Sequence, residues 1–216
     1  MPTIDYLVKN KKVPSTTQII SRFKNSTGLI IWANNLGKAG LDYFEELNKA
    51  GTIGTKTHEL GQYHIENKPY DLPTDPQVLN CFNQFLEWWD NSDYKVTWTE
   101  KPYASKKLLF GGCPDILVNG NILIDLKTSG KIYNDYIIQL SAYAELIKEV
   151  DNIEIKEAII VRFPKDDDQT EIMKFNKDDL AKGLKQFKTL RKAFDLDKDL
   201  NKILTKKRKE KRNELK

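Results

Sequence analysis

The stretch 115–127 carries three charged side chains, Asp115, Asp125 and Lys127, and constrains the fold of this chain more than any other part of its sequence. Apolar runs at 116–118 and 122–126 flank the Asn-Gly-Asn sequence at 119–121, a pattern that predicts a β-hairpin. Alternate side chains of a strand share a face, so Asp125 and Lys127 project together about 7 Å apart. The predicted hairpin therefore carries charged groups on one of its faces.

The length of the hairpin loop decides where Asp115 points. A two-residue loop at 119–120 would place Asp115 opposite Ile124, with its carboxylate on the face away from Asp125. A three-residue loop at 119–121, with a left-handed residue that Asn or Gly tolerates, places Asp115 directly across from Asp125. We predict the three-residue register, because only then do the two carboxylates converge.

Convergence of Asp115 and Asp125 has an electrostatic consequence. Two carboxylates about 4 Å apart repel by about 4 kcal/mol at an effective dielectric of about 20, and Lys127 alone cannot neutralise both. A hard divalent cation with oxygen ligands, Mg²⁺ or Mn²⁺, resolves this conflict. Such an ion polarises a phosphoryl oxygen and lowers the pKa of water, while Lys127 would stabilise the hydroxide or the developing negative charge. The hairpin predicts metal-dependent phosphate chemistry.

Two motifs around this hairpin resemble those of a known enzyme superfamily. Pro114-Asp115, nine residues and then Asp125-Leu126-Lys127 resembles the PD-(D/E)xK signature of metal-dependent nucleases, and QLSAY at 139–143 resembles the QxxxY motif of their RecB-like branch. The resemblance implies that the two acids and the Leu126 backbone carbonyl bind metal and that Lys127 serves the nucleophile. It also implies a set of supporting residues that position the nucleic acid: Thr128, Ser129, Gln139 and Tyr143.

Further candidate ligands lie upstream of the hairpin. The run GTKTHE at 54–59 resembles the GxxxH motif of RecB-like nucleases, whose histidine is a metal ligand. A single helical histidine is more often a packed or surface residue, but beside the downstream signature we interpret His58 as a ligand. Glu59 points about 100° away around the helix and is a secondary candidate. Glu100 either joins the acid cluster, as the RecB-like pattern suggests, or is a solvated strand residue paired with a lysine.

Periodicity and turn signals predict an α+β fold. We expect a restriction-endonuclease-like core, a central mixed sheet of about five strands flanked by helices. Trp32 is expected to anchor the core, and Thr52 or Thr55 to cap the helix that carries His58. The expected helices cover 16–24, two segments of 28–48, 52–66, 75–91, 133–149 and 178–194, and the expected strands cover 94–103, 106–110, the hairpin, 155–163 and 170–175.

The length of 216 residues suits a single domain followed by a tail. We predict one nuclease domain at 1–196, with a mostly helical part at 1–92 and a sheet core at 93–175, and then a basic helical tail at 197–216. Residues 198–216 hold nine Lys or Arg and three acids, a net charge of +6. Because the whole chain has a net charge of +4, the remaining residues together carry about −2. The tail is either a solvated end or a phosphate-binding arm.

Composition excludes several other classes of site. Cys81 and Cys113 belong to no CxxC pair, which argues against a disulfide framework, a zinc site or an iron–sulfur cluster, and we expect both to be small buried hydrophobes. No apolar run approaches the roughly 18 residues needed to cross a bilayer. We therefore expect no membrane partner and a cytoplasmic location, the host cytoplasm if the protein is phage-encoded.

The order of motifs between Pro14 and Phe175 is similar to that of mitochondrial genome maintenance exonucleases and phage or bacterial RecB-like relatives. The resemblance implies a Mg²⁺- or Mn²⁺-dependent DNA exonuclease that favours single-stranded ends and leaves 5′-phosphates, acting in repair or recombination beside other replication or recombination proteins. One alternative is a structure-specific or restriction-like endonuclease on the same fold. Another is a non-catalytic DNA-binding accessory protein.

Overall fold

The computed structural model describes residues 4–214, which form six helices and nine strands. In chain order these are β1 (Leu7–Val8), β2 (Lys11–Lys12), α1 (Thr16–Ser21), α2 (Thr27–Lys38), α3 (Tyr43–Ile65), α4 (Pro76–Asp90), β3 (Val96–Thr99), β4 (Tyr103–Ser105), β5 (Phe110–Gly112), β6 (Ile116–Val118), β7 (Ile122–Lys127), α5 (Asn134–Asp151), β8 (Glu157–Arg162), β9 (Glu171–Asn176) and α6 (Lys177–Glu214).

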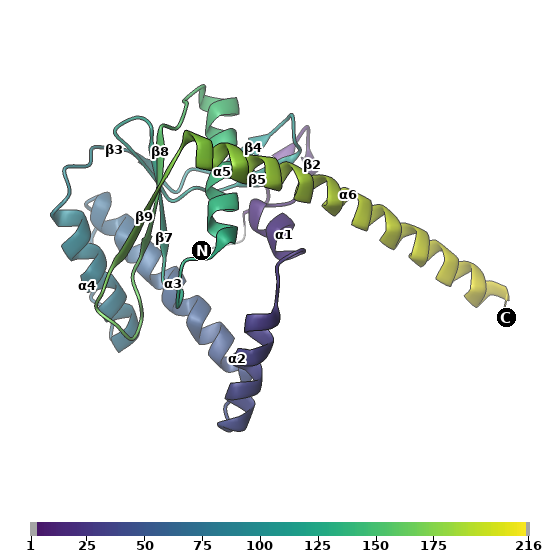
Figure 1. Ribbon diagram of the computed structural model, residues 1–216, viewed down its shortest axis with the longest axis horizontal. Helices are drawn as coiled ribbons and strands as arrows, with labels where there is room; N and C mark the ends of the chain where they lie inside the picture. Colours follow the sequence, from purple (N-terminus) through teal and green to yellow (C-terminus); the bar gives the residue numbers. More distant parts are fainter. Residues whose placement is uncertain (1–3, 215–216) are drawn as a thin grey trace.

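A five-stranded sheet with the order β3-β6-β7-β8-β9 forms the centre of the molecule (Figure 1). Only β7 and β8 pair in parallel, and the other neighbours are antiparallel, so the sheet is mixed. Two small pairs, β1 with β2 and β4 with β5, lie outside it. The predicted α+β fold, with a mixed sheet of about five strands flanked by helices, is confirmed.

Helices cover both faces of this sheet and make two hydrophobic cores. Leu123 of β7 lies in the core formed with α1, α5 and α6, whereas Ile124 and Leu126 lie in the core formed with α3 and α4. Because side chains alternate along a strand, Asp125 lies on the same face as Leu123, beneath α5. The strand β7 thus lies between two apolar layers and carries the buried Asp125 side chain on the face that α5 covers.

The β6–β7 hairpin has the predicted three-residue loop. Its pairs are Ile116 with Ile124, Leu117 with Leu123 and Val118 with Ile122, which leaves residues 119–121 as the loop. Asn119 and Gly120 have φ values of 51° and 75°, the left-handed conformations that this loop requires. Continuing the register by one residue places Asp115 across from Asp125.

The helix that carries His58 begins nine or more residues earlier than predicted. Asp42 caps α3 by accepting a hydrogen bond from Glu45 N at 2.9 Å, so the predicted caps, Thr52 and Thr55, are wrong. A glycine inside a helix costs only about 1 kcal/mol relative to alanine, which does not end a helix. At Gly54 a Cβ would lie 3.2 Å from Thr128 Oγ1, so glycine lets α3 approach the loop after β7.

The predicted strand at 106–110 is also wrong, because residues 106–109 form the turn between β4 and β5. The Glu149 carboxylate of α5 accepts hydrogen bonds from the backbone N–H groups of Lys106 and Lys107, at 2.9 and 3.2 Å. Ser105 Oγ also donates to Glu149, at 2.6 Å. A contact from a distant helix therefore fixes this turn.

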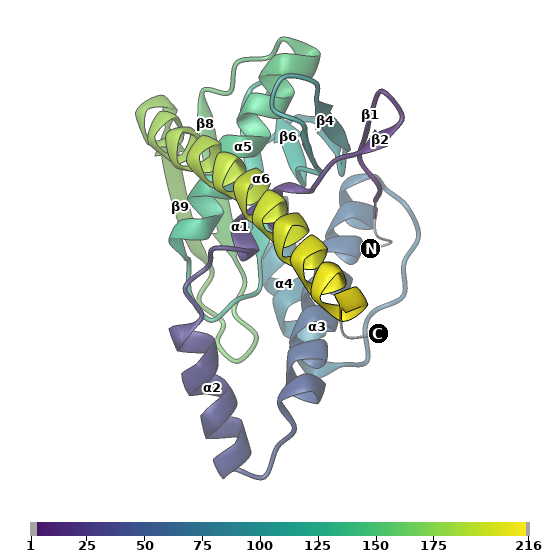
Figure 2. The same ribbon diagram turned by 90° about the vertical axis from the view of Figure 1, so that its right-hand side faces the viewer.

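The helix α2 and the first turns of α3 form an arm beside the two cores (Figures 1 and 2). No residue of α2 is buried, and Trp32 packs edge-on against Tyr43 with ring centroids 5.5 Å apart. Trp32 is therefore half-buried in a local contact, and the prediction that it anchors the core is wrong. Its partner Tyr43 begins α3, the helix against which α2 packs.

The long helix α6 has a packed half and a projecting half (Figure 1). Leu180 and Phe187 are buried against α5, whereas residues 198–213 are all exposed, with the aliphatic side chains Leu200, Ile203 and Leu204 among them. Packing ends near the predicted boundary at 196–197, but the helix itself continues to Glu214. The last two residues of the predicted tail lie outside the described residues. Between residues 4 and 214, no helix combines the length and apolar character needed to span a bilayer.

Candidate active site

Five ionisable side chains meet at one end of the β6–β7 hairpin. Asp115 directly precedes β6, Asp125 and Lys127 lie on β7, His58 comes from α3, and Glu100 follows β3. One ligand atom each from His58, Glu100 and Asp115 all lie within 4.8 Å of one another. The fold therefore brings together residues that are far apart in the sequence, and it places Glu100 in the acid cluster.

Backbone groups hold Asp115 in place. Its Oδ2 accepts a hydrogen bond from Leu126 N at 2.8 Å and lies 3.6 Å from His58 Nδ1. Its own carbonyl accepts a hydrogen bond from Glu100 N at 2.7 Å, and Glu100 adopts a left-handed φ of 45°. These contacts fix the Asp115 carboxylate between His58 and the β7 backbone.

The Asp125 carboxylate is the most deeply enclosed charge of the site. It is 1% exposed, Lys127 Nζ forms an ion pair with its Oδ2, and its Oδ1 has no hydrogen-bond partner among the described residues. Burial raises the pKa of Asp125 to about 6, and the nearby Asp115 charge adds to this against the opposing effect of Lys127. Such a carboxylate has unused acceptor capacity.

Three carboxyl groups share one lysine in this site. Burial and then the Asp115 charge raise the pKa of Glu100 to about 8, even though Cys113 Sγ donates to Glu100 at 3.4 Å. Burial also raises the pKa of Asp115. Burial alone would lower the pKa of Lys127, but the attraction of Asp125 and Asp115 outweighs it and raises the pKa above its usual value. A bound cation would relieve the remaining excess of negative charge.

His58 is neutral near pH 7. Burial, followed by the charge of Lys127, lowers its pKa to about 4, although Asp125 and a hydrogen bond to the Leu126 backbone act in the opposite direction. A neutral imidazole nitrogen has the free electron pair that a metal ion requires. The electrostatics of the site thus keep His58 in the neutral form that a metal ion can bind.

Gln139 and Tyr143 of α5 lie next to the acids. Gln139 Nε2 donates to Tyr143 Oη at 2.9 Å, and the ring of Tyr143 covers Gly112, where a Cβ would collide with it. Burial, and then the charges of Asp125 and Asp115, raise the pKa of Tyr143 well above its usual value. Tyr143 belongs to the hydrophobic core as well, so it serves as a core aromatic and as a wall of the site.

The other candidates occupy different positions. Glu59 is exposed, accepts a hydrogen bond from Tyr63 Oη at 3.0 Å, and is not among the acids that meet His58. Thr128 faces Gly54 of α3. Ser129 Oγ donates to the Lys131 carbonyl at 2.9 Å, which shapes the loop after β7.

Two residues at the site were not predicted. Cys113, expected to be a small buried hydrophobe, is half-buried and contacts Glu100. Tyr136 lies with its ring centroid 5.0 Å from Lys127 Nζ. Tyr136 precedes Gln139 by three residues and Tyr143 by seven, and this helical spacing is a sequence signal that could have identified it.

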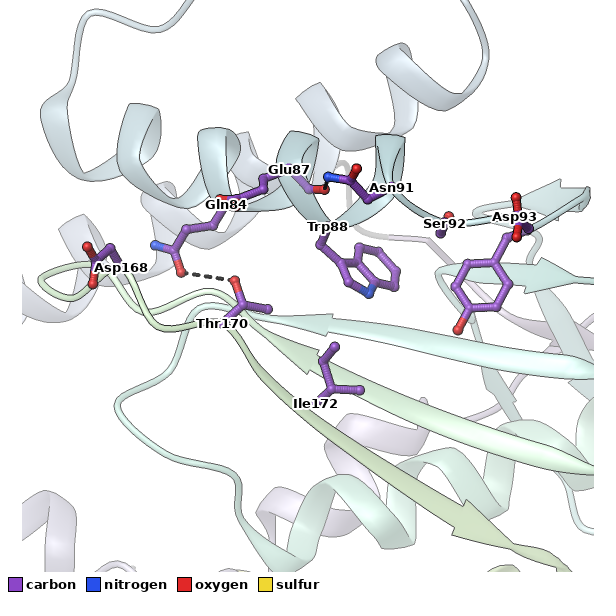
Figure 3. A pocket seen from close by; sticks show the side chains of 10 residues that line it. Gln84, Glu87, Trp88, Asn91, Ser92, Asp93, Asp168, Thr170 and Ile172 are labelled. Carbon is purple, nitrogen blue, oxygen red and sulfur yellow. Dashed lines mark hydrogen bonds between the residues drawn. The ribbon is translucent and has the colours of Figure 1, made fainter.

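A separate open groove of about 670 Å³ lies between α4 and the edge strand β9 (Figure 3). Trp88 and Ile172 line its apolar part, and Thr170 Oγ1 donates to Gln84 Oε1 at 3.3 Å across it. None of its lining residues belongs to the acid cluster. The residues with strongly shifted pKa values lie elsewhere, so this groove is not our candidate site.

Comparisons with known proteins gave matches among solved structures only. No protein-family model matches the chain, and no curated protein matches it. The alkaline exonuclease LHK-Exo from Laribacter hongkongensis in complex with dAMP aligns with a TM-score of 0.49 and 17% identity over 91% of this chain and 94% of that chain. A putative exonuclease from Eubacterium rectale aligns with a TM-score of 0.42 and 10% identity over 79% of this chain and 69% of that chain.

Proposed function

We propose that this protein is a nuclease that depends on a divalent metal ion and hydrolyses phosphodiester bonds at the site of Asp115, Asp125 and Lys127. The observation that carries the proposal is the buried Asp125 carboxylate, which in residues 4–214 has Lys127 as an ion-pair partner at Oδ2 and no hydrogen-bond partner at Oδ1. His58, Glu100 and Asp115 form a group with the spacing of metal ligands, and the charge of Asp125 acts on all three. A carboxylate kept in this condition costs stability unless a ligand compensates for it.

The residues present fit Mg²⁺ or Mn²⁺. Carboxylate oxygens and a neutral imidazole suit Mn²⁺, and oxygen donors suit Mg²⁺. Asp115, Asp125 and Glu100 would supply oxygens, His58 a nitrogen, and the Leu126 carbonyl is the proposed backbone ligand. When bound, the ion would supply electrophilic activation of the phosphoryl group and of water.

The remaining roles follow from the positions of the side chains. The Lys127 ammonium group, held by Asp125, can stabilise the negative charge that develops on the phosphoryl oxygens. The Leu126 N–H and His58 keep Asp115 oriented. Tyr143, fixed by Gln139, closes the site on the α5 side and limits the access of bulk water to the acids.

The finer assignment, an exonuclease that acts on single-stranded DNA ends and leaves 5′-phosphates, is supported by the resemblance of the motifs to the RecB-like branch. An end-labelled linear strand and a covalently closed circle of the same sequence, each incubated with Mn²⁺, test it. We expect the linear strand to be shortened and the circle to stay intact. Digestion of the circle would instead indicate an endonuclease.

The catalytic assignment is tested by Asp125→Asn, with Asp151→Asn as the matched control. Asp151 is likewise an aspartate paired with a lysine, but it is only partly buried, lies at the end of α5 and accepts hydrogen bonds from both Lys101 and Tyr103. We expect Asp125→Asn to lower the rate by about 1,000-fold and Asp151→Asn to retain the parent rate. An Asp125→Asn protein that digests DNA at the parent rate would refute the proposal.

A further inference from the structure

A row of lysine and tyrosine side chains leads away from the acid cluster. Lys127 Nζ lies 5.0 Å from the centroid of the Tyr136 ring, and Tyr136 meets Tyr133 edge-on with centroids 5.6 Å apart. Lys24 Nζ and Lys131 Nζ lie 5.0 and 5.4 Å from the Tyr133 ring. The row joins β7, the start of α5, the loop after β7 and the segment after α1.

Exposure increases along this row. The Lys127 side chain is 15% exposed, Tyr136 is half-buried against the core, and Tyr133 is 37% exposed. Tyr133 is the N-cap residue of α5, but its side chain makes no capping hydrogen bond, and it does not belong to either hydrophobic core. The Tyr133 ring therefore contacts Tyr136 without entering a core and does not cap the helix.

The outer end of the row carries more positive than negative charge. Lys24 and Lys131 are both exposed, and the one acid that pairs with them within the described part of the chain is Asp135, 3.2 Å from Lys24. Ser129 Oγ donates to the Lys131 carbonyl, and Arg162 Nη1 donates to the Ser129 carbonyl at 3.3 Å. These bonds hold the Lys131 loop in position before a ligand binds.

Exposed aromatic rings flanked by cations suit nucleic acid with unpaired bases. Each base can stack on a ring and each phosphate can pair with a lysine, whereas a duplex hides the faces of its bases. We infer that this row is the path of a single nucleic-acid strand toward the acid cluster, with a base on Tyr133 and adjacent phosphates on Lys24 and Lys131. The inference rests on the proposed function, because the acid cluster gives the path its destination.

Binding is tested with catalytically disabled protein. In the Asp125→Asn background, fluorescence anisotropy with a labelled single-stranded oligonucleotide should show about 10-fold weaker binding for Tyr133→Ala and near-parent binding for Tyr133→Phe, which keeps the ring. Tyr63→Ala is the matched control, because Tyr63 also lies near a lysine, with Lys68 Nζ 5.9 Å from its ring, but is on α3. Equal affinities for Tyr133→Ala and Tyr63→Ala would overturn the inference.

The lysines have a matched control at the opposite end of the sheet. Lys24 pairs with Asp135 at 3.2 Å, and Lys177 pairs with Glu154 at the same distance. Lys177 directly follows Asn176, which pairs with Glu157 at the start of β8. Lys127 pairs with Arg162 at the other end of β8, so Lys177 lies at the opposite end of the sheet. Lys24→Ala should reduce the slope of log Kd against log salt by about 0.7, and Lys177→Ala should leave it unchanged. An unchanged slope for Lys24→Ala would count against the path.

A small substrate separates failure of the path from failure of the proposed function. Bis(p-nitrophenyl) phosphate has a diester bond but no neighbouring nucleotide, so Tyr133→Ala should hydrolyse it with Mn²⁺ at the parent rate while its kcat/KM on an oligonucleotide falls about 10-fold. Equal losses on both substrates would overturn the path. If the parent hydrolysed neither substrate, the proposed function would fail, and the binding comparison would still decide the path.

The same binding assay compares DNA with RNA. DNA and RNA strands of one sequence offer identical phosphates and similar stacking faces and differ in the 2′-hydroxyl, so a difference between their affinities reports recognition of the sugar. A duplex of that sequence should bind more weakly than either single strand. Tighter binding of the duplex would contradict a path built on stacking.

Discussion

Two groups of carboxylates lie at different places in this fold, and they differ in how completely they are partnered. At the end of α5, Asp151 accepts hydrogen bonds from Lys101 Nζ at 2.8 Å and Tyr103 Oη at 2.5 Å, and Glu149 accepts three from the turn beside it. At the end of the hairpin, Asp125 has one ion pair, between Lys127 and its Oδ2, and its Oδ1 has no partner in the described chain.

The pKa values follow these partners. Burial alone would raise the pKa of Asp151, but hydrogen bonds from Lys101 and Tyr103 outweigh burial and lower it. Burial raises the pKa of Asp125 to about 6, and Lys127 does not compensate. A structural carboxylate is one whose acceptor positions are occupied by the protein, whereas a carboxylate for ligand binding keeps some of them free.

After exchange of the aspartates themselves, the largest expected difference between the two groups concerns the lysine beside each acid. Lys127→Met should lower kcat by about 100-fold or more, because the charge that develops in the transition state loses its stabilising cation. Lys101→Met, next to Asp151, should leave kcat unchanged. Initial rates on a labelled oligonucleotide with Mn²⁺ measure both, with circular dichroism as a check on folding. Similar losses for the two variants would remove the functional distinction between the two groups.

Metal binding should separate the groups without any measurement of turnover. A ligand that binds the folded state at about 100 times its Kd stabilises it by about 2.7 kcal/mol, so Mn²⁺ should raise the Tm of the parent by about 5 °C or more. Asp151→Asn should show the same rise, and Asp125→Asn should show little. EDTA should reverse the effect. A rise that survives in Asp125→Asn would place the metal elsewhere.

The partnered group should contribute to stability instead. Asp151→Asn removes the charge that Lys101 and Tyr103 stabilise, and hydrogen bonds to a charged group contribute about 1.5–3 kcal/mol. The free energy of unfolding in urea should therefore fall by about 2 kcal/mol at pH 7, with activity retained at low denaturant. An unchanged urea midpoint would show that hydrogen bonds to water stabilise the side chain as well as Lys101 and Tyr103 do.

The smallest effect is the pH dependence of that contribution. The folded-state pKa of Asp151 lies below its unfolded value of 3.8, so its stabilising effect is fully present above about pH 4 and is lost as the pH falls through the folded-state pKa. The difference in unfolding free energy between parent and Asp151→Asn should stay constant from about pH 7 to 5 and shrink below about pH 4. A difference that grows on acidification would show that folding raises the pKa of Asp151 and does not lower it.

The sequence was most informative where local rules and charge agree. Alternation along residues 122–127 and the turn chemistry of Asn119 and Gly120 predicted the hairpin, which the structure confirms. Turn chemistry allowed a two-residue or a three-residue loop, and the three-residue register was predicted because it alone lets Asp115 and Asp125 converge; the structure confirms that register as well. The roles of these acids in metal binding remain predictions.

Predictions failed where a distant contact decides the conformation. Thr52 and Thr55 were predicted as caps but lie inside α3, where Gly54 allows a close approach to Thr128 on another element. Residues 106–109 form a turn because Glu149 holds their N–H groups. Trp32 is a large aromatic residue of the kind that anchors cores, yet no residue of α2 is buried. No periodicity within these segments contains that information.

By itself, the sequence determined the β6–β7 hairpin and the α+β class, and it gave Asp115 and Asp125 as proposed metal ligands. It also named His58 and left Glu100 open between the acid cluster and solvent. Tertiary structure decided that Glu100 lies beside His58 and Asp115, and that Tyr136 of α5 lies beside Lys127. The physical reason is desolvation, since the cost of burying a charge depends on every element packed around it and not on its neighbours in the chain.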